Sequence, residues 1–150
     1  MENIKSFYDL EQLVKQSVKN HIIDNREHIN EARKEYLEDH GKIDGFFYQD
    51  DMRDGSRDIA DNYVIYYYDA WQICNVSRFD APSGCDYFWQ AESEIQDCHD
   101  GSEYIDKYMT SIAYLIVESL AMEFFSEFLL VEKLPFDVPT EKLVEAIEAL

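Results

Sequence analysis

Residues 103–132 read EYIDKYMTSIAYLIVESLAMEFFSEFLLVE, and this stretch predicts a long helix at the centre of the fold. Apolar residues recur every three or four positions along it, which is the spacing of one helical face: Ile105, Met109, Ile112, Ile116, Leu120, Phe124 and Phe128. A helix this apolar must be covered on most sides. We therefore expect it to be either the core of the fold or half of an oligomer interface.

Within this helix, the residues chosen as candidates for self-association are Ile116, Leu120 and Phe124. They would bring two copies of the chain together as a homodimer. Three glutamates, Glu118, Glu123 and Glu127, interrupt the apolar stretch. Charges at that density argue against a membrane span.

Toward the N-terminus the sequence predicts a helix that Ser6 caps, with Asp9 in the capping-box position. Its apolar residues are spaced by three and four: Leu10, Leu13, Val14, Val18, Ile22, Ile29, Ala32, Tyr36 and Leu37. Gly41 is the expected end. Residues 7–39 would form a helix about 50 Å long, so we expect a break near Asp24 and Asn25.

The middle of the chain is less regular in pattern. Residues 41–62 are rich in Gly and Asp and predict an irregular segment. The aromatic and β-branched run 63–68 favours a short strand, although Asp69 could instead cap a helix that follows it. Further helices are expected over 87–98 and 141–150. The sequence thus predicts a single acidic helical domain, residues 1–150, built as a compact bundle of about five helices around the central one.

Composition indicates a folded domain with an acidic surface. The 150 residues include 32 acids and 13 bases, a net charge of -19, and 46% are hydrophobic. Such a charge disfavours direct binding to nucleic acid or to anionic membranes, because both need Lys and Arg to neutralise phosphates. Three widely spaced cysteines, Cys74, Cys85 and Cys98, and an N-terminus without an apolar run favour a reducing cytoplasm.

The acids are unevenly distributed. From Phe79 to Asp106 the chain has eight acids and no Lys or Arg. These are the candidate partner-binding residues: Asp80, Asp86, Glu92, Glu94, Asp97, Asp100, Glu103 and Asp106. Paired helices could align such carboxylates at spacings near those of nucleic-acid phosphates, which lie about 1.7 Å apart along a duplex axis. The alternative is an acidic face that only keeps the protein soluble.

No pattern in the sequence defines a catalytic or metal site, so we predict no catalytic residue, no metal ligand and no cofactor. An EF-hand loop aligned on Gly55 would place Met52 at a ligand position and Arg57 among the acids. Cys98 and His99 are adjacent, and adjacent helical residues point in different directions. A metal-dependent enzyme of unknown reaction stays as an alternative.

Two stretches resemble small uncharacterised acidic proteins of tailed bacteriophages. The first is 59–73, with Asp61, Val64, Tyr66, Tyr67, Asp69 and Trp71, and the second is 100–125, where Asp100-Gly101-Ser102 leads into the long helix. No activity is implied by this resemblance. In charge and size alone, the chain also resembles DNA-mimic inhibitors of the anti-restriction and anti-CRISPR classes.

These observations favour a phage or mobile-element accessory protein that acts in the cytoplasm of a bacterial host. It would bind a basic, nucleic-acid-binding host protein through a DNA-mimicking acidic surface and inhibit it. The first alternative is a self-associating structural or assembly protein that uses the apolar 103–132 helix.

Overall fold

The computed structural model describes residues 4–41, 50–64, 68–98, 108–130 and 140–149. In this part of the chain 84% of residues are helical and no strand is formed, which confirms the mainly α fold. It has seven α-helices, two more than the bundle of about five expected, and one π-helix. The elements are α1 (Phe7–Asp24), α2 (Arg26–His40), α3 (Asp50–Asp58), the π-helix η2 (Ile59–Val64), α4 (Ala70–Phe79), α5 (Tyr87–Cys98), α7 (Met109–Leu130) and α8 (Thr140–Glu148).

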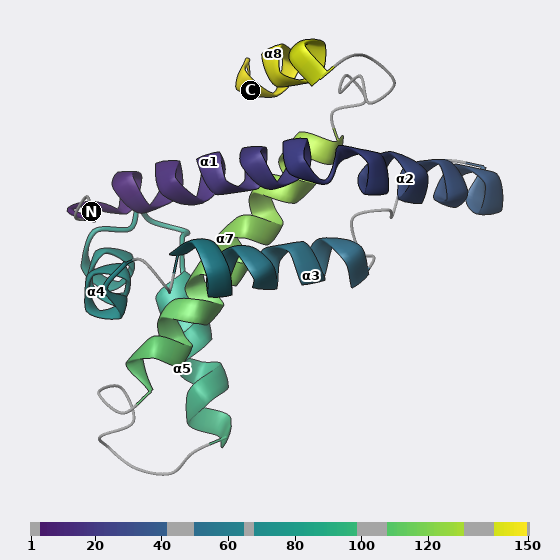
Figure 1. Cartoon of the computed structure of the whole chain (residues 1–150). Coiled ribbons are helices and arrows are strands. Elements are labelled where there is room, and N and C mark those ends of the chain that lie inside the picture. The colour runs from purple at the N-terminus through teal and green to yellow at the C-terminus, as the bar shows by residue number, and fades with distance from the viewer. Residues whose placement is uncertain (1–3, 42–49, 65–67, 99–107, 131–139, 150) are drawn as a thin grey trace.

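Helix α7 is the centre of the fold, as its sequence predicts. It contacts α1, α3, η2, α4 and α5, and α1 and α3 both run across it (Figure 1). Its buried residues form a wide face: Met109, Ile112, Ala113, Ile116, Val117, Leu120, Ala121, Phe125 and Phe128. Ala113 and Ala121 are buried beside the predicted apolar residues and widen the buried face. Their small side chains leave room for neighbouring helices.

Two of the three residues proposed for self-association pack into the core of the single chain. Ile116 is 0% exposed and Leu120 is 3% exposed. Phe124 is partly buried, and its ring stacks on that of Phe128 with centroids 5.8 Å apart. Of these three residues, Phe124 alone is partly accessible to a second molecule.

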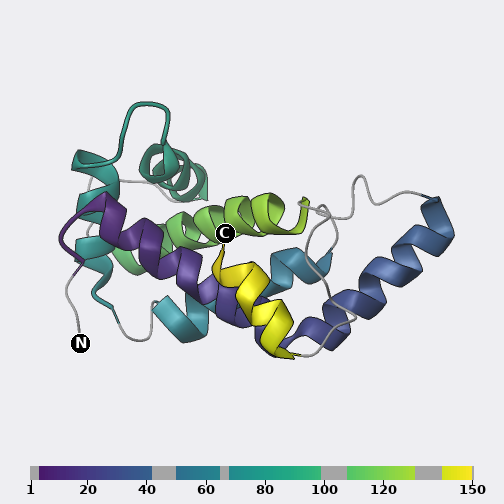
Figure 2. The same cartoon turned by 90° about the horizontal axis from the view of Figure 1, so that it is seen from above.

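Helix α1 begins and ends where local signals place it. The Ser6 hydroxyl accepts a hydrogen bond from the Asp9 N–H at 3.1 Å, and the Asp9 carboxylate accepts one from the Lys5 N–H at 3.0 Å. The predicted break also occurs, since Asn25 separates α1 from α2. Helix α2 projects away from the packed helices (Figures 1 and 2). Gly41 follows it with φ of 73°, a left-handed conformation that glycine adopts without strain.

The sequence predicts an irregular segment over 41–62, but residues 50–62 are helical in the structure. They form α3 and most of η2, both of which contact α7. The expected strand at 63–68 is also wrong where it is described, because Tyr63 and Val64 complete the π-helix, and 65–67 lie outside the described residues. Burial explains the difference: Ser56, Ile59 and Ala60 are all 0% exposed, so tertiary packing dominates weak local preferences.

The next two helices follow their predicted signals. The Asp69 side chain accepts a hydrogen bond from the Trp71 N–H and caps α4. The thiol of Cys74 lies 3.5 Å from the Met109 carbonyl, which ties α4 to the start of α7. The loop between α4 and α5 turns at Gly84, where φ is 93°. Helix α5 then buries Phe88 and Ala91, as predicted.

Candidate partner-binding surface

Four of the eight predicted partner-binding residues lie in the described part with their side chains. They are Asp80, Asp86, Glu92 and Glu94. The side chain of Asp97 and the whole of Asp100, Glu103 and Asp106 lie outside it. Glu92 and Glu94 are two residues apart on α5, so they point about 200° apart around the helix. The four carboxylates therefore do not form a single row.

Asp80 has a structural role that its sequence position does not reveal. Its carboxylate accepts a hydrogen bond from the Phe7 N–H at 2.8 Å. Phe7 is the first residue of α1, where N–H groups have no partner within the helix and where negative charge is favourable. Asp80 thus joins the end of α4 to the start of α1 and is not simply a surface charge.

Replacing Asp80 with alanine is expected to lower the free energy of unfolding by about 1 kcal/mol, because an acceptor at a helix N-terminus is lost. Asp80→Asn keeps an acceptor and loses only the charge, so its effect should be smaller. Urea denaturation of the two variants checks this. An Asn variant as unstable as the Ala variant would show that charge, not the hydrogen bond, stabilises this junction.

Glu94 belongs to a different surface. It lines a hollow of about 370 Å³ between η2, α5 and α7, together with Asp61, Ile95, Thr110, Ser111, Tyr114 and Leu115. Beside this region, the guanidinium of Arg57 lies 3.7 Å from the Glu118 carboxylate. Burial raises the pKa of the Tyr114 phenol, and the charges of Glu118 and Asp61 raise it further.

The structure brings together acids that no single stretch of sequence contains. We call Glu11, Asp86, Glu123 and Glu127 the acidic cluster. They come from α1, from the residue before α5 and from α7. Partial burial raises the pKa of the Glu123 carboxyl, and the charges of Glu127 and Glu11 raise it further. Burial likewise raises the pKa of the Cys85 thiol, with added contributions from Glu11, Glu123 and Asp86.

Two lysines border the acidic cluster along α1. Lys15 lies one turn beyond Glu11, and its Nζ is 6.0 Å from the centroid of the Phe128 ring. The Nζ of Lys19 is 5.9 Å from the same centroid. Burial lowers the pKa of Lys19, and the charge of Lys15 lowers it further. Both ammonium groups thus lie near an aromatic ring of α7, where a cation is attracted to the ring face.

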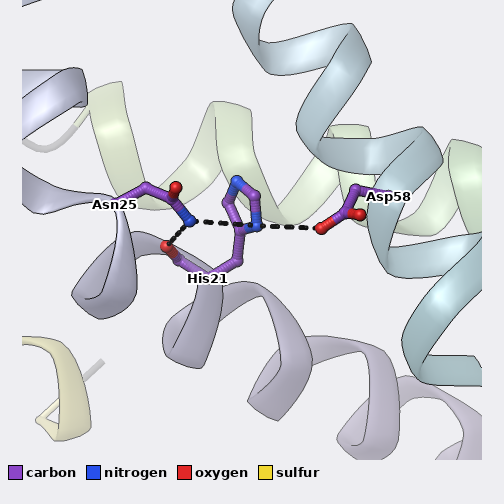
Figure 3. Close-up of polar contacts among 3 residues, drawn as sticks. All are labelled: His21, Asn25 and Asp58. Atoms are coloured by element: carbon purple, nitrogen blue, oxygen red, sulfur yellow. Dashed lines mark hydrogen bonds and ion pairs between the residues drawn. The ribbon is translucent and has the colours of Figure 1, made fainter.

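The remaining titratable groups favour packing over catalysis. Burial raises the pKa of the Cys74 thiol to about 12, so it is protonated and a poor nucleophile. The side chain of His21 is 15% exposed, and Figure 3 shows it with Asn25 and Asp58 beside it. Its Nδ1 lies 3.8 Å from the Asp58 carboxylate, and Asn25 donates to the His21 carbonyl at 2.9 Å. Burial lowers the pKa of His21, which keeps the ring neutral near pH 7.

The other edge of the His21 ring faces protein. A Cβ atom built on Gly55 would lie 2.9 Å from its Nε2, so the ring packs against the backbone of α3. The ring also meets Phe125 edge-on, with centroids 5.5 Å apart. This histidine therefore fills the junction of α1, α3 and α7 and does not face an open site.

The chain matches no family model, and no curated protein or solved structure is significantly similar to it. Among the described residues, no group of three or more His, Cys, Asp or Glu side chains is arranged to hold a metal ion. One helix, over Met109–Phe128, is long and apolar enough to cross a membrane by length and composition. The core helix of a globular fold passes the same test, and α7 is such a core helix.

Proposed function

We propose that this protein binds a basic, nucleic-acid-binding protein of a bacterial host and blocks its nucleic-acid site. It would act in the cytoplasm as an accessory protein of a phage or mobile element. The observation that supports this is the acidic cluster, in which Glu11 and Glu127 act on the charge of Glu123, and Glu11, Glu123 and Asp86 all act on the Cys85 thiol. Glu123 and Glu127 are one helical turn apart, but Glu11 and Asp86 come from distant parts of the sequence.

Crowding of like charges is unfavourable for the isolated chain. Glu123 and Glu127 are four residues apart on α7, a spacing at which like charges destabilise a helix. Glu11 of α1 adds a third charge and raises the pKa of Glu123 further. A cationic partner would relieve this repulsion on binding. A surface that serves only solubility gains nothing from holding its charges so close together.

The mechanism that follows is electrostatic. Lys and Arg side chains of the partner, which otherwise bind phosphates, would bind carboxylates of the acidic cluster and of α5. Complementary charge speeds association and makes it sensitive to salt. The burial of Ile116 and Leu120 in the core favours this hypothesis over self-assembly, because the residues proposed for assembly already contact their own chain.

Neutralising the acidic cluster is expected to abolish partner capture. The variant is Glu11→Gln, Asp86→Asn, Glu123→Gln and Glu127→Gln. Its matched control is Glu27→Gln, Glu31→Gln, Glu35→Gln and Glu38→Gln, which removes the same charge from exposed positions on α2. Each tagged protein is incubated with bacterial lysate, and bound proteins are eluted with rising salt and quantified by mass spectrometry.

We expect a basic, nucleic-acid-binding protein that binds the wild type and the α2 control and is lost from the cluster variant. Its own binding to nucleic acid should be inhibited by the wild type in a separate assay. Equal loss from both variants would reduce the effect to net charge and contradict the proposed surface.

A further inference from the structure

Two of the four large apolar side chains that are exposed among the described residues lie at the junction of α4 and α5, close in sequence to Asp86; the other two, Tyr8 and Trp71, lie at the starts of α1 and α4. Phe79, the last residue of α4, is 74% exposed, and Trp89 in the first turn of α5 is 48% exposed. Exposed apolar side chains that lie together, unlike scattered single ones, often mark an interaction site. Trp, in particular, is enriched among the residues that dominate binding interfaces.

Arg78 lies beside both rings. Its guanidinium carbon lies 5.0 Å from the centroid of the Phe79 ring, 5.4 Å from that of Phe88 and 5.5 Å from that of Trp89. Phe88 is buried and meets Trp89 edge-on, with centroids 5.2 Å apart and planes at 89°. We call these four residues the aromatic–arginine cluster. Contacts with Arg78, and for Trp89 with the buried Phe88 ring, restrict the exposed rings, so a partner would lose less free energy in fixing them.

Basic residues are scarce in the sequence around the aromatic–arginine cluster. Arg78 is the only Lys or Arg in residues 58–106. Its guanidinium lies within cation–π distance of three rings, two of which, Phe79 and Trp89, keep about half or more of their surface exposed. Asp86 lies three residues before Trp89, and the Gln90 N–H bonds to the Asp86 carbonyl, so helical geometry already holds there. Asp86 and Trp89 therefore share one side of α5.

We infer that the partner is a protein that binds single-stranded nucleic acid, an inference that rests on the proposed function. Single-strand-binding sites combine a basic groove for the backbone with aromatic platforms on which bases stack. Duplex-binding sites instead contact phosphates and base edges within the grooves. A carboxylate beside exposed rings presents both features of a single strand: Asp86 stands for phosphate, and Phe79 and Trp89 stand for unstacked bases.

The test is competitive elution from the immobilised full-length protein after incubation with bacterial lysate. The competitors are oligothymidylate and a duplex of mixed sequence, each at matched phosphate concentration. Phe79→Ala and Trp89→Ala remove the two rings singly and together. Tyr8→Ala is the matched control, because Tyr8 is 66% exposed on α1 and lies outside the cluster. All these side chains are exposed, so circular dichroism should show unchanged folding.

We expect oligothymidylate to elute the bound protein at lower concentration than the duplex does. Loss of each ring should weaken binding at least about fivefold, since stacking of one base on an aromatic ring contributes roughly 1–3 kcal/mol, and Tyr8→Ala should have no effect. Preferential elution by duplex, or unchanged binding by the ring variants, would overturn this inference and leave the proposed function standing. Absence of any salt-sensitive, cluster-dependent partner would remove both.

Discussion

Ile116→Ala is expected to lower the free energy of unfolding by about 2–5 kcal/mol, the usual cost of emptying a buried aliphatic site. Ile116 is 0% exposed and lies within α7, the helix that α1, α3, η2, α4 and α5 all contact. The cavity would open at the centre of the core, so neighbouring side chains could collapse into it only partly. Urea denaturation followed by circular dichroism measures the change.

Phe124→Ala is the comparison that separates core packing from self-association. Phe124 is only partly buried, so its truncation should cost less than that of Ile116. If these residues formed a dimer interface instead, Phe124→Ala and Ile116→Ala would both shift the sedimentation coefficient toward that of a smaller species. Unfolding of the Ile116 variant would then depend on protein concentration. We expect stability to change with no dependence on concentration.

The parts of the fold that could be predicted depend on neighbours in sequence. The caps at Ser6 and Asp69 act over two or three residues, and both are present in the structure. The apolar stripes of α1 and α7 repeat over several turns, so their burial follows from spacing alone. The break at Asn25 was likewise expected, because an uninterrupted helix would be too long for a small domain.

The parts that could not be predicted depend on residues far apart in the chain. Residues 50–62 have poor helical propensity, and only their packing against α1 and α7 makes them helical. Asp80 was assigned to a binding surface because nothing in the sequence pairs it with Phe7, 73 residues away. The proximity of Glu11 to Glu123 could not be predicted for the same reason, because these residues are far apart in the sequence. One feature of the sequence did point to the acidic cluster, namely the pair of glutamates, Glu123 and Glu127, in an otherwise apolar helix.

Gly55 shows how the centre of the fold constrains a single position. It lies within α3, where glycine costs about 1 kcal/mol relative to alanine in a helix. A Cβ atom at this position would lie 2.9 Å from Nε2 of His21 and 3.3 Å from Cζ of Phe125. The ring of His21 has little freedom to retreat, since Phe125 meets it edge-on and Asp58 lies at its other nitrogen.

Gly55→Val is therefore expected to lower the free energy of unfolding by about 3 kcal/mol, at the upper end of overpacking costs. Gly55→Ala should also destabilise the chain, by less, although alanine favours the helix. The decisive measurement repeats Gly55→Ala in a His21→Ala background. With the imidazole removed, the closest contact disappears and the helical preference for alanine should dominate, so the same substitution becomes neutral or stabilising. Equal effects in both backgrounds would show that α3 does not approach α1 as closely as the structure has it.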